Sequence, residues 1–324
     1  MSATDGLGRL VTVFGGSGFI GRNVVRALAR RRWRIRVAVR RPDLAIHLQP
    51  IGTVGQIHAI QANIRVPWSI ERALEGADAA VNLVGTFKNS GAQNFASIAA
   101  GAGVVAEAAR AGGLAALVQM SAIGADPASP SAFARAKAAG EANARESFPG
   151  AVVMRPSVVF GPEDDFFNKF AGLGRLVPLM PLVHGGRTRF QPVYVGDVAE
   201  AIARAVDGEA GTGTTYELGG PEILTLRECL DLVMRETGRQ RPYLPVPAAL
   251  ARIPAWFFEF LPRSLLTRDQ LKLLAIDNLV SDAAIRDGRT LDGLGIDPVP
   301  LAAVLPSYLY RYRRRGQYDR QKTA

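Results

Sequence analysis

The chain has 324 residues, of which 48% are hydrophobic and 21% charged, a composition typical of a soluble protein with a sizeable core. Its single cysteine, Cys229, excludes an intrachain disulfide, and its three scattered histidines show no metal-ligand spacing, so we expect a reducing compartment and no metal. No signal peptide is visible, and no apolar run reaches the roughly 18 to 20 residues that a membrane-spanning helix needs.

The net charge is +10, and the arginines gather in two segments, around residues 30–41 and 311–322. Such a balance suits an anionic membrane surface, an acidic protein or nucleic acid, and equally a solvated face that binds nothing. Because the chain carries no nucleic-acid-binding motif, we expect no nucleic-acid partner.

The N-terminal half alternates between strand-like and helix-like patterns. Residues 10–14 form an apolar run that ends in glycines, residues 22–31 have helical spacing, and residues 35–39 are a second apolar run. The alternation continues with strands at residues 56–61, 79–83, 117–120 and 152–155, and with helices at 70–74, 94–111 and 132–147. This order predicts an α/β fold: a Rossmann-type, doubly wound parallel sheet with right-handed crossovers.

After Gly161 prolines and glycines interrupt the pattern. We expect a strand at residues 190–195, a helix at 197–206, a strand at 216–218 and a helix at 226–236, followed by a Pro-interrupted apolar segment at 245–266. The prediction is a Rossmann domain at residues 1–160 and a smaller, partly helical C-terminal lobe at 161–324 that ends in a basic tail. Residues 190–206 are expected to return to the first domain.

A glycine-rich loop lies between the first strand and the first helix. It has the pattern G-x-x-G-x-x-G and consists of Gly15, Gly16, Ser17, Gly18, Phe19, Ile20 and Gly21. Residues without a Cβ allow the tight turn and the close approach of backbone amides to a pyrophosphate, and the helix N-terminus adds partial positive charge. In its strand–turn–helix context the loop predicts a dinucleotide site, the alternative being a glycine-rich turn without a ligand.

The end of the second strand bears on which dinucleotide is bound. NAD(H) sites carry an acidic residue about 20 residues after the loop, whereas here Arg40 and Arg41 follow the strand. A guanidinium pairs with a 2′-phosphate and stacks on adenine, which favours NADP(H) over NAD(H) unless both arginines are only surface charge. Asn63 is expected near the adenine, and Leu83, Val84 and Gly85 along the cofactor's ribose.

These residues resemble the short-chain dehydrogenase/reductase superfamily, in its extended or atypical branch, over nearly the whole chain. The resemblance is carried by the glycine loop, by residues 82–85, 155–162 and 192–199, and by Lys137 with Glu141. It implies that Lys137, Pro156 and Val158 also belong to the cofactor site.

Within the superfamily the chain looks most like the nucleotide-binding accessory subunit of respiratory complex I and its bacterial relatives. The motifs that carry this likeness are residues 160–168, 190–197 and 267–271, then Leu294-Gly295-Ile296 before a basic, Tyr-rich C-terminus. The resemblance implies complex I subunits as partners. The absence of a visible presequence favours a bacterial member, located in the cytoplasm and peripheral on the cytoplasmic face of the inner membrane.

Catalytic members of the superfamily carry Tyr-x-x-x-Lys on a helix, so that the ammonium lowers the pKa of a phenol that transfers a proton. Here the lysine is Lys137, but Phe133 replaces the tyrosine and has no hydroxyl. The helper hydroxyl falls on Ser121 or, in another register, on Ala122 or Ile123, which have none. We therefore expect nucleotide binding with little or no oxidoreductase turnover, unless another tyrosine, such as Tyr194, enters the site.

The C-terminal lobe leaves its role open. Residues 254–262 crowd four large aromatics near arginines, which suits a membrane interface or simply the core of the lobe. Three hypotheses follow: a weakly catalytic or non-catalytic NADP(H)-binding subunit of complex I near the quinone arm; an active NADP-dependent reductase or epimerase of nucleotide sugars, quinones or isoprenoid carbonyls; and a redox sensor.

Overall fold

A computed structural model describes residues 8–86, 94–246, 268–314 and 316. The contacts divide the chain into two compact units. The first runs to Pro156 and also contains Val195–Leu218 and Ser281–Asp297; the second contains Ser157–Tyr194, Gly219–Val280 and the chain from Pro298. The sequence had placed the boundary near residue 160 and the return at residues 190–206. The contacts place residues 157–160 and 190–194 in the second unit, and they add a further return at 281–297.

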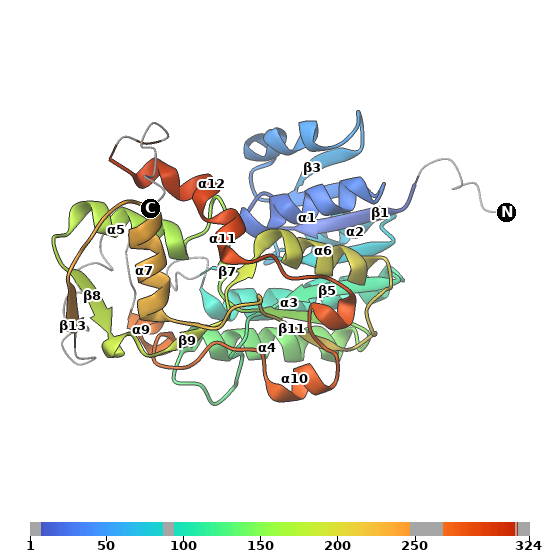
Figure 1. Cartoon of the computed structure of the whole chain (residues 1–324). Helices are drawn as coiled ribbons and strands as arrows, with labels where there is room; N and C mark the ends of the chain where they lie inside the picture. The colour runs from blue at the N-terminus through green and yellow to red at the C-terminus, as the bar shows by residue number, and fades with distance from the viewer. Residues whose placement is uncertain (1–7, 87–93, 247–267, 315, 317–324) are drawn as a thin grey trace. The chain divides into compact units, whose positions relative to one another are not determined.

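A seven-stranded parallel sheet is the centre of the first unit (Figure 1), as the alternating pattern predicted. Its order is β11-β6-β5-β4-β1-β2-β3. The strands are β1 (Leu10–Phe14), β2 (Arg34–Val39), β3 (Ile57–Gln61), β4 (Ala79–Asn82), β5 (Ala116–Met120), β6 (Val152–Pro156) and β11 (Thr215–Leu218). The strand order reverses at β1, with β2 and β3 on one side and β4, β5, β6 and β11 on the other. Open parallel sheets bind ligands at such a reversal, beside the carboxyl ends of the strands.

Helices cover both faces of the sheet. The pair α1 (Phe19–Arg30) and α6 (Val195–Val206) lies on one face, and α3 (Phe95–Ala111) and α4 (Ala132–Ser147) pack against each other on the other face, beside α2 (Pro67–Leu74) (Figure 1). Small residues let α3 and α4 approach closely: a Cβ on Gly140 would lie 3.7 Å from Ala102. Short helical segments η1 (Pro42–Ile51), α10 (Asp282–Arg286) and η3 (Asp292–Leu294) complete the unit.

The second unit has a core of its own, in which α5 (Phe166–Leu176) packs against α7 (Leu226–Glu236). A capping box at Thr225 and Glu228 starts α7, whose apolar face is buried. The unit also contains β7 (Val159–Phe160), β8 (Met180–Val183), η2 (His184–Gly186), β9 (Arg189–Phe190), β10 (Val193–Tyr194), β12 (Leu224–Thr225), β13 (Tyr243–Val246), α9 (Arg268–Leu273), α11 (Leu301–Val304), α12 (Pro306–Leu309) and η4 (Tyr310–Tyr312).

The single strand expected at residues 190–195 is wrong in detail. The structure has two short strands there, β9 and β10, which pair with different partners, β12 and β7. Pro192 lies between them and has no N–H to continue a ladder. The aromatic segment 254–262 lies outside the described residues. Among the described helices, none is long and apolar enough to cross a membrane.

Candidate functional site

The glycine loop follows β1 directly, and its geometry requires glycine at particular positions. Gly15 has φ +77°, a left-handed conformation that L side chains rarely adopt, and a Cβ on it would lie 3.3 Å from the backbone of Leu83. A Cβ on Gly21 would lie 2.4 Å from the carbonyl oxygen of Gly15, closer than real atoms approach. A Cβ on Gly16 would meet a methyl group of Val37 at 2.9 Å. The loop is therefore a cradle of bare backbone at the carboxyl end of β1.

The loop continues into α1, which begins after Gly18. As glycine, Gly18 has no side chain to cap the helix, so the first-turn amides point outward with the positive end of the helix dipole. Ser17 and Phe19 flank this point, and both are partly exposed, as is Ile20. An anion such as a pyrophosphate fits this arrangement without any cationic side chain.

The next strand of the sheet brings Leu83, Val84 and Gly85 beside the loop. The amide of Leu83 donates to the carbonyl of Phe14 at 3.0 Å, so the chain after β4 continues alongside β1. The buried side chain of Asn82 fixes this segment, because its Oδ1 accepts from the amide of Val84 at 3.2 Å. The backbone of these residues therefore forms a second wall next to Gly15.

Arg40 and Arg41 are exposed at the end of β2, the other neighbour of β1. The guanidinium of Arg41 donates through Nε and Nη2 to the carboxylate of Asp43, at 3.0 and 2.7 Å. This ion pair raises the pKa of Arg41 and lowers that of Asp43. The sequence prediction did not include Asp43, although an acidic residue two positions after an arginine indicates a local ion pair. A 2′-phosphate would compete with this carboxylate for the guanidinium.

Asn63 lies just beyond β3, the strand next to β2. Its side-chain Oδ1 accepts a hydrogen bond from the backbone amide of Arg65 at 3.1 Å, and its backbone amide donates to the hydroxyl of Ser69 at 3.1 Å. The residue is thus held in a tight turn at the same edge of the sheet as the glycine loop, although β2 separates β3 from β1.

Phe133 and Lys137 occupy successive turns of α4, on one face of the helix. The Nζ of Lys137 lies 5.7 Å from the ring centroid of Phe133, and the ring packs edge-on against Phe95. The same Nζ donates to the carbonyl of Met120 at 3.4 Å and would lie 3.4 Å from a Cβ on Gly85. The ammonium therefore lies beside the second wall of the site, with an aromatic ring and no phenol next to it.

The ammonium of Lys137 is largely withdrawn from water. Burial lowers its pKa to about 8, and the negative charge of Glu141, one helical turn on, opposes this shift. Glu141 is itself buried and accepts two hydrogen bonds from Arg155, at 2.8 and 2.7 Å, which raise the pKa of that arginine. The carboxylate is thus engaged by the guanidinium, and Lys137 stays a desolvated cation that an oxygen-rich ligand would stabilise.

Ser121 follows β5 and lies 4% exposed. Its hydroxyl is buried without a hydrogen-bond partner among the described residues, although its amide donates to the carbonyl of Met154 at 2.7 Å. Such an orphaned hydroxyl is costly in an apolar interior and uncommon. Together with the glycine cradle, it is an observation that fits a polar ligand at the carboxyl edge of the sheet.

The sheet brings together nearly all the residues expected at the site. The glycine loop, the Arg40 segment, Asn63, Leu83 with its neighbours, Ser121 and Pro156 all follow or end strands at one edge, and Lys137 contacts this edge from α4. Val158 and Tyr194 belong to the second unit, where the ring of Tyr194 packs 5.7 Å from that of Phe160. Their membership of the site stays a prediction.

Comparisons with known proteins agree with this geometry. The model of the NAD dependent epimerase/dehydratase family matches residues 11–219. NADH dehydrogenase (ubiquinone) 1 alpha subcomplex subunit 9, mitochondrial, of Arabidopsis thaliana is 33% identical over 95% of this chain and 79% of its own length. A ceramide reductase of Caulobacter vibrioides is 32% identical over 62% of this chain and 61% of its own length.

Among solved structures, the NADPH-dependent quinone oxidoreductase of Escherichia coli superimposes with a TM-score of 0.74 at 20% identity. The match covers 93% of this chain and 99% of the other, and at this identity it supports the fold. The family match extends over the sheet and its glycine loop, and the likeness to the plant subunit over nearly the whole chain. The chain therefore belongs to the NAD dependent epimerase/dehydratase family and, within it, to the group of the NADH dehydrogenase (ubiquinone) 1 alpha subcomplex subunit 9 proteins.

Proposed function

We propose that the protein binds NADP(H) in the first unit and keeps it as a structural ligand. The observation that carries this proposal is the glycine cradle, where Gly15 and Gly21 leave room only for backbone. The pyrophosphate would lie over the first turn of α1, and the nicotinamide half would extend past Leu83, Val84 and Gly85 toward Lys137. A ligand that binds only the folded chain stabilises it by mass action.

The preference for NADP(H) over NAD(H) rests on Arg40 and Arg41. No acidic side chain occupies the position directly after β2, where a ribose 2′-hydroxyl would need an acceptor. The Arg41 guanidinium already adopts a two-pronged geometry on Asp43, which is the geometry that a 2′-phosphate oxygen pair requires. If the more highly charged 2′-phosphate replaced the Asp43 carboxylate, the Arg41 guanidinium would contact the cofactor.

The residues at the nicotinamide end of the proposed site favour binding of the nucleotide over catalytic turnover of a substrate. The bound nucleotide would supply hydride chemistry, but a carbonyl substrate also needs a proton donor. Phe133 cannot donate one, and its ring fills the position beside Lys137. Lys137 is suited to donate hydrogen bonds to ribose hydroxyls, which would compensate its desolvated ammonium.

As its biological role we propose an accessory or assembly subunit of respiratory complex I, near the quinone arm. The likeness to the Arabidopsis thaliana subunit over 95% of the chain supports this role. The protein would lie peripherally on the cytoplasmic face of a bacterial inner membrane, with its net charge of +10 favouring an anionic surface.

The test combines localisation with binding. Native membranes are prepared at low salt, one half is washed at high salt, and a tagged chain is followed together with NADH:ubiquinone oxidoreductase activity on native gels. Co-migration with the complex is expected for the wild type, and release of the protein without the complex would refute the subunit role. Fluorescence titration of the purified protein is expected to show tighter binding of NADPH than of NADH.

The alternative is an active NADP-dependent reductase or epimerase, and two observations favour it. Ser121 presents a buried hydroxyl without a partner in the described chain, and a ceramide reductase is among the relatives. The discriminating assay measures NADPH oxidation with carbonyl and quinone substrates. Robust turnover that Lys137→Ala abolishes would establish the enzyme and refute the non-catalytic proposal.

A further inference from the structure

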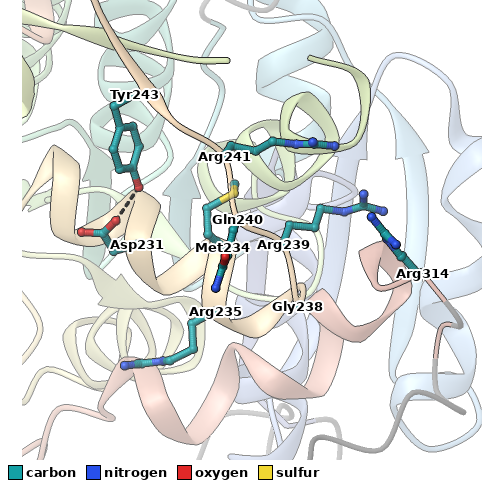
Figure 2. Close-up of a pocket in the computed structure, with 9 residues that line it drawn as sticks. All are labelled: Asp231, Met234, Arg235, Gly238, Arg239, Gln240, Arg241, Tyr243 and Arg314. Carbon is teal, nitrogen blue, oxygen red and sulfur yellow. Dashed lines mark hydrogen bonds between the residues drawn. The ribbon is translucent and has the colours of Figure 1, made fainter. Parts of the chain in front are cut away.

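The second unit contains a cavity of about 820 Å³ at the C-terminal end of α7 (Figure 2). Four arginines are among the residues that line it: Arg235, Arg239, Arg241 and Arg314. Figure 2 shows the side chains of Arg239, Arg241 and Arg314 on one side of the cavity, whereas Arg235 points toward the opposite side. The volume is within the usual range of small-molecule sites, about 300–1,000 Å³.

Where the described residues give the three grouped arginines a partner, it is a backbone carbonyl. Within the described chain, no carboxylate forms an ion pair with Arg239, Arg241 or Arg314. Arg239 donates to the carbonyl of Tyr312 at 3.2 Å, and Arg241 donates to the carbonyl of Gly174 at 3.1 Å. Backbone carbonyls orient these two guanidinium groups but leave their charges uncompensated.

The electrostatics of Arg239 show how concentrated this charge is. Burial lowers the pKa of Arg239, and the positive charges of Arg241, Arg175 and Arg314 lower it further. The carbonyl end of α7 supplies about half a negative charge, which is too little to balance three guanidinium groups. Like charges gathered around a cavity raise the free energy of the free protein, and an anion would relieve that cost.

Two acidic side chains of α7, Asp231 and Glu236, face partners other than the grouped arginines. Asp231 accepts a hydrogen bond of 2.5 Å from the hydroxyl of Tyr243, on the wall away from the three arginines (Figure 2). Glu236 lies 3.7 Å from Arg313 and 3.9 Å from Arg235. Neither carboxylate is in an ion pair with the grouped arginines.

We propose that this cavity is a binding site for a phosphate-bearing ligand, held by Arg239, Arg241 and Arg314. Guanidinium groups form paired hydrogen bonds with the oxygens of a phosphate monoester or a pyrophosphate. A carboxylate offers only two oxygens, so it can pair with fewer of the three arginines. All the residues that line the cavity belong to the second unit, whereas the glycine loop belongs to the first. The phosphate is either that of a soluble metabolite or that of a phospholipid headgroup.

The test uses the full chain saturated with NADPH, so that the glycine loop does not take up the probe. Inorganic pyrophosphate is titrated by calorimetry, and flotation is measured with phosphatidylcholine vesicles with and without phosphatidic acid. The test variant is Arg314→Gln, since Arg314 is exposed and its loss removes no hydrogen bond that the described chain makes. The matched control is Arg187→Gln, which removes the same charge from an exposed side chain of the same unit that does not line the cavity.

We expect Arg314→Gln to weaken binding at least about tenfold, the scale of one charge-assisted hydrogen bond, and Arg187→Gln to leave it within about twofold. Saturable pyrophosphate binding with this pattern supports the proposal with a soluble ligand. Flotation that needs phosphatidic acid and shows the same pattern supports it with a lipid headgroup. Absence of both signals, or an equal loss in the two variants, overturns the proposal.

Discussion

The close packing of Gly21 offers the sharpest test of the glycine loop. Gly21 is the third residue of α1, and at an ordinary helical position a Gly→Ala change stabilises by up to about 1 kcal/mol. Here the new methyl would lie 2.4 Å from the oxygen of Gly15 and 2.6 Å from the backbone of Gly16. Overpacking against side chains costs about 1–3 kcal/mol, and backbone yields less readily. We therefore expect Gly21→Ala to destabilise the protein by about 2 kcal/mol or more and to abolish NADPH binding.

Gly18→Ala is the control for stability. Gly18 precedes the helix with φ −74°, and a Cβ there would lie 3.4 Å from the oxygen of Gly15, an ordinary contact. Its cost is expected to stay at or below about 1 kcal/mol, the difference between glycine and alanine at an N-cap. Urea unfolding followed by circular dichroism measures both variants, and fluorescence titration measures NADPH affinity. A Gly21→Ala variant as stable as Gly18→Ala, or one that binds NADPH like the wild type, would refute the packing argument.

Three further predictions concern the surrounding side chains. Lys137→Met is expected to stabilise the ligand-free protein at pH 7, because folding lowers the pKa of the Lys137 ammonium from 10.5 to about 8. Between these two pH values the unfolded wild-type chain binds more protons than the folded one, so wild-type stability rises with pH. The stability advantage of the variant therefore shrinks over this range. A constant difference in urea melts from pH 7 to 10.5 would contradict this. Asp43→Asn releases Arg41 from an exposed ion pair and is expected to raise NADPH affinity by up to about fivefold, with NADH affinity unchanged as the internal control. Phe133→Tyr places a phenol beside Lys137 and is expected to raise NADPH-dependent carbonyl turnover at least about 100-fold, the usual contribution of a general acid. Equal turnover in variant and wild type would show that the missing hydroxyl does not limit the reaction.

Local sequence pattern determined most of the first unit and the centre of its site. Alternating apolar runs and helical periodicity depend on neighbouring residues, so the strands of the sheet and the helix at residues 132–147 could be predicted from them. The glycine loop and the spacing of Phe133 and Lys137 are local in the same sense. Because parallel strands end at one edge, the sheet order then brings these residues together.

The tertiary structure decided what depends on contacts between distant segments. Two such features join segments that are far apart in the chain: residues 281–297 belong to the first unit, and Arg239, Arg241 and Arg314 line one cavity. A third depends on which residues cover it, namely the buried hydroxyl of Ser121, which has no hydrogen-bond partner among the described residues. No period or spacing encodes such pairings, because they follow from packing and from which charges are left without an opposite charge once the chain is folded. The sequence by itself predicted the parallel sheet and the glycine loop of the first unit, and only the folded chain revealed the basic cavity of the second unit.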